Sequence, residues 1–153
     1  MNFLHNPFRG TGFVHQEGMA QGEVSTDPSE AEALLRRCPV AMPTPLHDMS
    51  GLARLMAVEA VMLKDESQRM GLGSFKALGA AYVIAREAAL RADKAGVAAS
   101  FADMKDALRG TVYVCASAGN HGLSMAAGAR IFGATAVVYL SQAIPEAFAN
   151  RLR

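Results

Sequence analysis

The sequence predicts an α/β fold in which helices flank an open, mostly parallel sheet, and two observations support this. Apolar, β-branched residues near 111–115 and 134–140 indicate two strands, with a helix rich in small residues between them. A strand, a helix and a second strand within about 30 residues form a crossover unit, whose strands run parallel. The composition, with 51% hydrophobic and 19% charged residues, predicts that these elements enclose a core.

The N-terminal part is predicted to be mostly irregular. Glycines and a proline interrupt any periodic pattern over residues 1 to about 30, which we interpret as an irregular arm. A short helix is expected near 28–37, with Asp27 or Ser29 as its cap, because Pro28 and acidic residues suit a first helical turn.

Three elements are expected in the next part of the chain. Closely spaced prolines exclude a regular helix over 38–49 and favour an extended segment. Residues 49–57 are consistent with a helix. Residues 60–64 are predicted to form a short apolar strand that ends in a charged cluster.

The C-terminal half is predicted to be rich in helices. Apolar residues recur with helical spacing from Ala77 to Ala88, and Lys76 falls in the first turn of this expected helix. Residues 93–109 are predicted to form a short helix or a loop before the crossover unit. A last helix is expected after Pro145, and because the chain stops inside it, we expect an incomplete domain.

Charge and composition exclude several functional classes. The formal net charge is +1 and neither sign forms a long run, so no nucleic-acid or anionic-membrane partner is expected. No apolar run reaches the roughly 18 residues of a membrane helix and no signal peptide is recognisable, so we expect a cytoplasmic protein. Cys38 and Cys115 lie far apart without ligand spacing around them, which predicts neither a metal site nor a disulfide framework.

The stretch GLGSFKALG at residues 71–79 has the composition of a ligand-binding turn. Its glycines let the backbone turn tightly and approach a ligand closely. Lys76 falls where a helix begins, and the positive helix end helps its amine to act as a nucleophile that forms a Schiff base. An ordinary exposed lysine is the alternative interpretation. A nucleotide-phosphate loop is excluded because Phe75, rather than glycine, precedes the lysine.

A second motif, SAGNHG at residues 117–122, lies between a predicted strand and a predicted helix. Ligands of open parallel sheets bind beyond the carboxyl ends of the strands, where helix N-termini point amide hydrogens at anions. The loop from Ser117 to His121 is therefore expected to hold a carboxylate. Asn120 offers a donor and an acceptor to a phenolic oxygen. The alternative is a tight strand-to-helix turn with Asn120 as its cap.

Together with TPL at 44–46 and LKDES at 63–67, these motifs follow the order of one enzyme family. The segment from roughly residue 42 to 153 resembles the N-terminal half of the fold type II pyridoxal-phosphate enzymes. These include threonine and serine dehydratases, threonine synthase and the tryptophan synthase β chain. QRMGLGSFKALG and PEAFANRLR are most similar to diaminopropionate ammonia-lyases. The chain departs from that pattern at Ala118, where the pattern has an Asp, and its loop is closer to that of threonine dehydratases.

The resemblance implies a role for each residue of the two motifs. Lys76 would hold pyridoxal phosphate as a Schiff base and would take the α-proton of the substrate. Phe75 would pack on the pyridine ring, and Asn120 would hydrogen-bond to the ring hydroxyl oxygen. The loop that receives the substrate carboxylate would consist of Ser117, Ala118, Gly119 and His121.

The activity that the resemblance implies is a lyase reaction. Ammonia or water would leave the β-carbon of a small amino-acid substrate, which would become a 2-oxo acid and ammonia. Threonine or serine dehydration and an inactive truncated fragment are the alternatives. We divide the chain into an N-terminal arm with a short helix (1–40) and a partial enzyme domain (41–153). The family's glycine-rich phosphate loop is not recognisable after residue 122, and a homodimer is expected of the full-length form.

Overall fold

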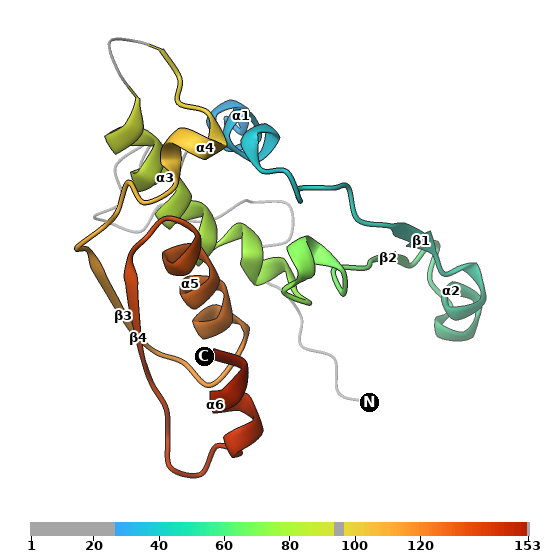
Figure 1. Ribbon diagram of the computed structural model, residues 1–153. Helices are drawn as coiled ribbons and strands as arrows, with labels where there is room; N and C mark the ends of the chain where they lie inside the picture. Colours follow the sequence, from blue (N-terminus) through green and yellow to red (C-terminus); the bar gives the residue numbers. More distant parts are fainter. Residues whose placement is uncertain (1–26, 94–96, 153) are drawn as a thin grey trace, which may run out of the picture.

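The computed structural model describes residues 27–93 and 97–152 (Figure 1). Its elements, with the short 3-10 helices labelled η, are in chain order α1 (Ser29–Arg37), β1 (Leu46–Asp48), α2 (Ser50–Met56), β2 (Met62–Lys64), η1 (Arg69–Gly71), η2 (Phe75–Leu78), α3 (Ala80–Ala92), α4 (Phe101–Met104), β3 (Val112–Ala116), α5 (Asn120–Ile131), β4 (Thr135–Tyr139) and α6 (Glu146–Leu152).

The crossover unit predicted from the sequence is present. Strands β3 and β4 pair in parallel, with Val112 opposite Thr135 and Ala116 opposite Tyr139. Helix α5 connects the two strands and packs against both, and α3 packs along α5 (Figure 1). The carboxyl end of β3 therefore leads directly into the first turn of α5, which is where the sequence placed a ligand-binding loop.

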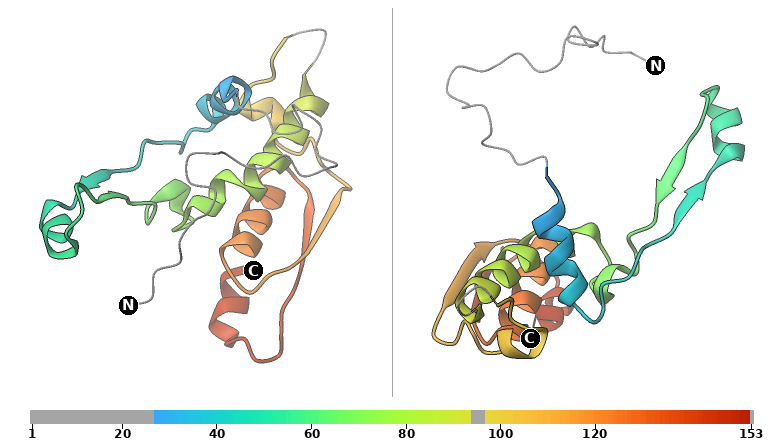
Figure 2. Two further views of the ribbon diagram at one scale, coloured as in Figure 1. Left: turned by 180° about the vertical axis from the view of Figure 1, so that it is seen from behind. Right: turned by 90° about the horizontal axis from the view of Figure 1, so that it is seen from above.

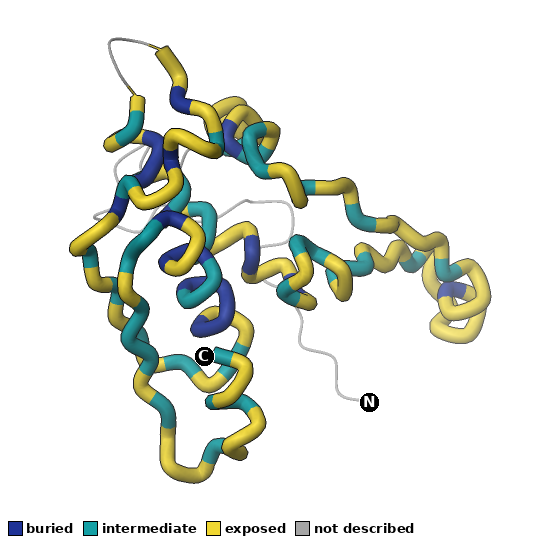
Figure 3. Tube along the Cα trace, in the orientation of Figure 1, coloured by how far each residue is buried: buried dark blue, intermediate teal, exposed yellow. Residues whose placement is uncertain are grey.

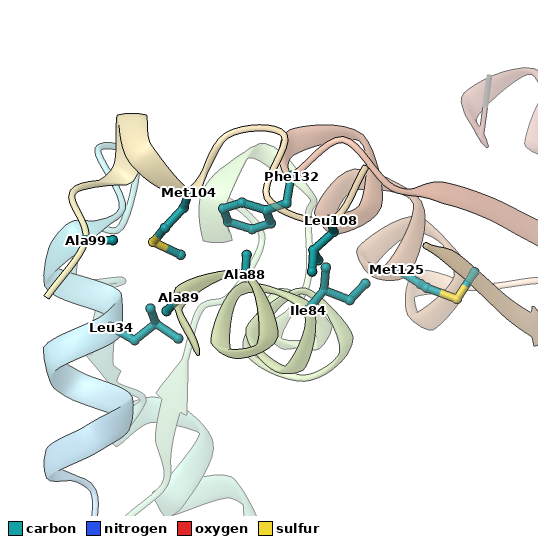
Figure 4. Close-up of a cluster of buried hydrophobic side chains, with 9 residues drawn as sticks. All are labelled: Leu34, Ile84, Ala88, Ala89, Ala99, Met104, Leu108, Met125 and Phe132. Carbon is teal, nitrogen blue, oxygen red and sulfur yellow. The ribbon is translucent and has the colours of Figure 1, made fainter. Parts of the chain in front are cut away.

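The hydrophobic core forms around α3. Ile84 and Ala88 of this helix are buried together with Leu108 and Phe132 from other elements (Figure 4). The rings of Phe101 and Phe132 make an edge-to-face contact, with centroids 5.9 Å apart. Burial of such apolar side chains is the main driving force of folding. The core thus fixes α3, and with it the segment that precedes α3 in the chain.

Helix α1 confirms the prediction of a helix near 28–37. Its Leu34 is buried and belongs to the core around α3. The N-cap residue is Pro28 and no side chain makes a cap hydrogen bond, so the prediction of Asp27 or Ser29 as the cap is wrong. The Asp27 carboxylate still accepts hydrogen bonds from the backbone N–H of Ser29 (2.9 Å) and from its hydroxyl (2.5 Å). Residues 1–26, which include most of the predicted irregular arm, lie outside the described residues.

Residues 46–64 form a projection from the rest of the structure (Figure 2). Strands β1 and β2 pair antiparallel within it, with Leu46 opposite Lys64, and α2 connects them at the far end. Most of this segment is exposed (Figure 3), and Ala53 is its single buried residue. Large apolar side chains such as Leu55 are exposed in it. The contacts that hold the projection in place are therefore to be found at its base.

The prediction of one open, mostly parallel sheet is wrong for the described residues. They form two separate two-stranded sheets, of which β3–β4 is parallel and β1–β2 is antiparallel. The prolines of the segment 38–49 end just before β1, and α2 turns the chain back so that β2 runs in the opposite direction. Strands of three residues are too short for an alternating pattern that would reveal how they pair.

Candidate active site

The backbone before Lys76 makes a tight turn. Met70, Gly71 and Gly73 have positive φ angles of 50°, 71° and 76°. Glycine adopts this left-handed region at little cost, which explains why two of the three positions are glycine. The hydroxyl oxygen of Ser74 then accepts a hydrogen bond from the backbone N–H of Lys76 at 3.3 Å and begins the short helix η2.

Lys76 lies in η2, and the prediction that it belongs to the first turn of the following helix is wrong. Gly79, with φ −102° and ψ −97°, separates η2 from α3. The Lys76 residue is exposed, and its Nζ lies 5.0 Å from the centroid of the Phe75 ring, which is itself 58% exposed. The lysine amine is thus open to solvent beside an aromatic ring.

The second motif forms the junction between β3 and α5. The hydroxyl oxygen of Ser117 accepts hydrogen bonds from the backbone N–H groups of Gly119 (3.4 Å) and Gly122 (3.1 Å). A Cβ at Gly122 would lie 2.8 Å from the Ser117 carbonyl oxygen, so glycine is required for this close approach. The N-cap residue of α5 is Gly119, so the alternative that Asn120 is the cap is wrong, and the Ser117 hydroxyl accepts from the first turn from outside the helix.

The first turn of α5 presents open backbone donors. The N–H of Leu123 donates to Gly119 and that of Gly122 to Ser117, whereas no described residue accepts from the N–H of Asn120 or His121. Such groups have no acceptor inside the helix, and the helix dipole adds partial positive charge there. Gly119 has nothing within 4 Å of the place where a Cβ would lie. The loop therefore offers an accessible site for an anion.

The structure brings the two motifs together. Helix η2 packs against α5, and the hydroxyl of Ser124 on α5 donates to the carbonyl oxygen of Lys76 at 2.6 Å. Asn120 lies four residues before Ser124 and so shares its helix face, one turn nearer the N-terminus. Lys76 and Asn120 consequently belong to neighbouring surfaces, although Lys76 and its partner Ser124 are 48 residues apart in the chain.

A polar cluster at the base of the projection was not predicted from the sequence. The Glu66 carboxylate accepts from the Thr44 hydroxyl (2.5 Å) and from the Arg69 guanidinium (2.6 and 2.7 Å). The same guanidinium donates to the carbonyl oxygen of Met42 (3.1 Å), and the Lys64 ammonium donates to the carbonyl oxygen of Thr44 (2.6 Å). The cluster links the start of the projection to the turn that leads to Lys76.

This cluster perturbs the titration of its members. The hydrogen bonds from Arg69 and then Thr44 lower the pKa of Glu66 to about 2, and the hydrogen bond to Glu66 raises the pKa of Arg69. The motif LKDES placed Glu66 in a charged cluster, and its spacing of three residues from Arg69 was the available signal. The contribution of Thr44 depends on a contact across 22 residues, which no local pattern shows.

A large apolar groove lies next to the candidate site but does not contain it. It has a volume of about 320 Å³ and lies between α1, α3 and α5. Ala77 is the only residue of η2 among those that line it. Within residues 27–93 and 97–152, no cluster of His, Cys, Asp and Glu suitable for a metal occurs, and no helix is long and apolar enough to cross a membrane.

The geometry of the lysine turn and of the start of α5 indicates a class of ligand-binding site, and comparison with known families shows to which family the chain belongs. An exposed lysine in a glycine-rich turn, beside the N-terminus of a helix that follows a parallel strand, is an arrangement suited to holding a carbonyl group and an anion together. Residues 39–153 match the family model described as pyridoxal-phosphate dependent enzyme. The chain belongs to this family.

Diaminopropionate ammonia-lyases are among the proteins similar to this chain. The enzyme of Salmonella typhimurium is 34% identical over 116 residues, which cover 72% of this chain and 29% of the relative. The enzyme of Escherichia coli strain K12 is 37% identical over 99 residues, covering 64% of this chain and 25% of the relative. The crystal structure of the E. coli enzyme in apo form superposes with a TM-score of 0.70 at 31% identity, covering 86% of this chain and 38% of that one.

The chain therefore spans well under half the length of these relatives. The superposition shows that the α/β architecture corresponds to part of a diaminopropionate ammonia-lyase. The groups of the candidate site fit the family's cofactor as a donor set: an exposed amine for its aldehyde, an aromatic ring at 5.0 Å from that amine, and an exposed amide side chain at Asn120 for its ring oxygen.

Proposed function

We propose that this chain supplies the cofactor-binding lysine and the carboxylate-binding loop of a pyridoxal-phosphate-dependent lyase. The observation that carries the proposal is the hydrogen bond between Ser124 and the carbonyl of Lys76, because it joins the lysine turn to the helix whose N-terminus is open. Family membership over residues 39–153 supports the choice of cofactor.

Each residue of the two motifs has a place in this proposal. Pyridoxal phosphate, when bound, supplies an electron sink that stabilises negative charge on the α-carbon of an amino acid. Lys76 holds the cofactor through its amine, and Nζ takes the α-proton once it is free. Phe75 offers an apolar face beside that amine. The side chain of Asn120 donates to or accepts from the cofactor's ring oxygen.

The carboxylate of the substrate is assigned to the loop at the start of α5. The N–H groups of Asn120 and His121 are open, and the helix dipole favours negative charge at this end. The hydroxyl of Ser117 accepts hydrogen bonds from two backbone N–H groups of the loop, so its role in this proposal is to stabilise the conformation of the loop. The loop residues so assigned are Ser117, Ala118, Gly119 and His121.

The reaction proposed is β-elimination from a small amino acid, and diaminopropionate is the first substrate to test. The diaminopropionate ammonia-lyases, at 34% and 37% identity, support this choice. Ala118 favours a second candidate, a threonine or serine dehydratase, because the loop lacks the Asp of the diaminopropionate pattern. Diaminopropionate would give pyruvate with two ammonia molecules, serine would give pyruvate with one, and threonine would give 2-oxobutyrate. Measuring both products separates the candidates.

The test of the site uses the 153-residue chain with pyridoxal phosphate, followed by borohydride reduction and peptide mass spectrometry. We expect a visible absorbance band and a pyridoxyl group on Lys76, both lost in Lys76→Ala. Lys105→Ala is the matched control, since Lys105 is also exposed but lies at the end of α4, outside the site. Labelling spread over several lysines at equal rates would contradict the proposed site. A labelled chain without turnover would support the third candidate, an inactive fragment.

A further inference from the structure

Ser124 makes two hydrogen bonds that no motif in the sequence indicates. Its side chain is fully buried, and the hydroxyl donates to the carbonyl oxygen of Lys76 at 2.6 Å. The same oxygen accepts from the backbone N–H of Ala81 at 3.0 Å. One hydroxyl on α5 therefore holds both ends of the short segment that runs from the lysine to the start of α3.

The bond to Ala81 satisfies a group that α3 itself leaves without an acceptor. The first N–H groups of a helix have no partner within it, and a side chain at the N-cap position usually accepts from one of them. The N-cap residue of α3 is Gly79, which has no side chain. Ser124 supplies the missing oxygen from a neighbouring helix, so its loss would leave the Ala81 N–H with no acceptor among the described residues.

The close contact of α3 with α5 lets this short side chain reach its partners. A Cβ at Gly128 would lie only 3.0 Å from the Cα of Ala81, so a glycine there keeps the two backbones near each other. A Cβ at Gly79 would lie 3.3 Å from the carbonyl oxygen of Lys76, so a larger residue would crowd the atom that Ser124 binds. Ser124, Gly128 and Gly79 thus form one packing arrangement around the carbonyl group of Lys76.

This arrangement sets the place of Lys76 along α5. Ser124 is one helical turn from Asn120 on the same face, which corresponds to about 6 Å along the helix axis. The lysine backbone is thus fixed one turn from the loop assigned to the substrate carboxylate. We propose that Ser124 is a positioning residue for Lys76, which fixes the spacing between the lysine amine and the N-terminus of α5. This inference rests on the proposed function of Lys76 in holding the cofactor.

The experiment compares the affinity of the 153-residue chain for pyridoxal phosphate between wild type and Ser124→Ala. We expect about tenfold weaker binding in the variant, because two hydrogen bonds that hold the lysine turn are lost. The matched control is Ser100→Ala, which also removes a hydroxyl that both donates and accepts, but in the capping box of α4, where its partner is Asp103. The control is expected to bind the cofactor as the wild type does.

A second measurement follows amide hydrogen exchange of residues 76–83 without cofactor. It is expected to be faster in Ser124→Ala, with no change in Ser100→Ala. Where the wild type binds the cofactor on Lys76, an affinity of Ser124→Ala within about twofold of wild type overturns the proposal. If the wild type acquires no pyridoxyl group on Lys76, the proposed function fails. The role of Ser124 is then decided by hydrogen exchange alone, and unchanged exchange in Ser124→Ala would show that Ser124 does not hold the turn around Lys76.

Ser124→Cys covers the case in which the alanine variant does not fold. A thiol of similar size is a weaker donor and acceptor than a hydroxyl. Its affinity is therefore expected to lie between those of the wild type and Ser124→Ala. An affinity of Ser124→Cys equal to that of the wild type overturns the proposal in the same way, since the strength of the two hydrogen bonds would then not matter for the lysine.

Discussion

Glu66 is a single carboxylate that receives three hydrogen bonds from Thr44 and Arg69, so its charge contributes to folding. Its pKa is lowered from 4.5 to about 2 in the folded chain. A group with a lowered pKa stabilises the folded state above its unfolded pKa, and this contribution disappears as the pH falls through the folded pKa. The stabilisation by Glu66 is therefore complete at neutral pH and is lost between about pH 4.5 and 2.

We expect Glu66→Gln to unfold at a lower urea concentration than the wild type at pH 7. The difference in urea concentration should shrink as the pH falls from about 4.5 toward 2. Protonation removes the negative charge of Glu66 from the wild type in this range, whereas the substitution removes that charge at every pH. Urea unfolding followed by circular dichroism across this range measures it. Glu59→Gln, at an exposed position on the projection, serves as the control. A difference that stays constant with pH would show that the charge of Glu66 is not what stabilises the chain.

Gly122 is a second residue whose identity is fixed by a contact. We expect Gly122→Ala to destabilise the chain by about 1–3 kcal/mol, because the added Cβ would meet the Ser117 carbonyl oxygen at 2.8 Å. Gly51→Ala is the matched control, since Gly51 is also a helical glycine but has nothing within 4 Å. Alanine is the better helix former by roughly 1 kcal/mol, so the control should be stabilised. Chemical denaturation measures both, and equal effects would contradict the contact.

The residues that a local motif marks could be predicted from the sequence, and those defined by distant contacts could not. Lys76 and the loop from Ser117 to His121 lie in glycine-rich stretches whose composition indicates a turn or a helix start. Ser124 looked like an ordinary helix residue, since its partner is Lys76, 48 residues away in the chain. The contact of Arg69 with Thr44 spans 25 residues in the same way. Residue type alone does not reveal such pairs.

At the scale of elements, the strong periodic patterns were predicted well and the short ones poorly. The crossover unit formed by β3, α5 and β4 is confirmed, because its strands and helix are long enough to show their own periodicity. The pairing of β1 with β2 was missed, since each strand has three residues. The break at Gly79 was missed too, because η2 and α3 together continue one apolar pattern.

The projection is attached through its base, so weakening the base should loosen its strands. Thr44 donates to Glu66 at 2.5 Å and accepts from Arg69 at 2.8 Å, and Thr44→Val removes both hydrogen bonds. We expect amide exchange in Met62–Lys64 to rise by about fivefold, which corresponds to about 1 kcal/mol of lost local stability. Thr135→Val on β4 is the control, at an exposed strand position. Unchanged exchange in Met62–Lys64 would show that other contacts hold the projection.

For the whole molecule, the described residues account for some contacts of the proposed pyridoxal-phosphate site and not for others. They offer an amine at Lys76, an amide at Asn120 and open donors at the start of α5. The N-terminus of α3 is not open in the same way, since the Ala81 N–H already donates to Ser124. With the open donors of α5 assigned to the substrate carboxylate, the described part of the chain has no further cluster assigned to the cofactor phosphate.

This division of contacts predicts how the chain distinguishes pyridoxal phosphate from pyridoxal. Each charge-assisted hydrogen bond to a phosphate contributes about 1.5–3 kcal/mol. A formed phosphate site with several such bonds would therefore bind pyridoxal phosphate more than about a hundredfold more tightly than pyridoxal. We expect the 153-residue chain to prefer it by less than about tenfold, because binding then depends mainly on Lys76 and Asn120. Titration of both compounds, with reduction to confirm labelling of Lys76, measures the ratio. A preference above a hundredfold would contradict the assignment of the α5 donors, and Gly119→Ala would then test whether that loop holds the phosphate instead.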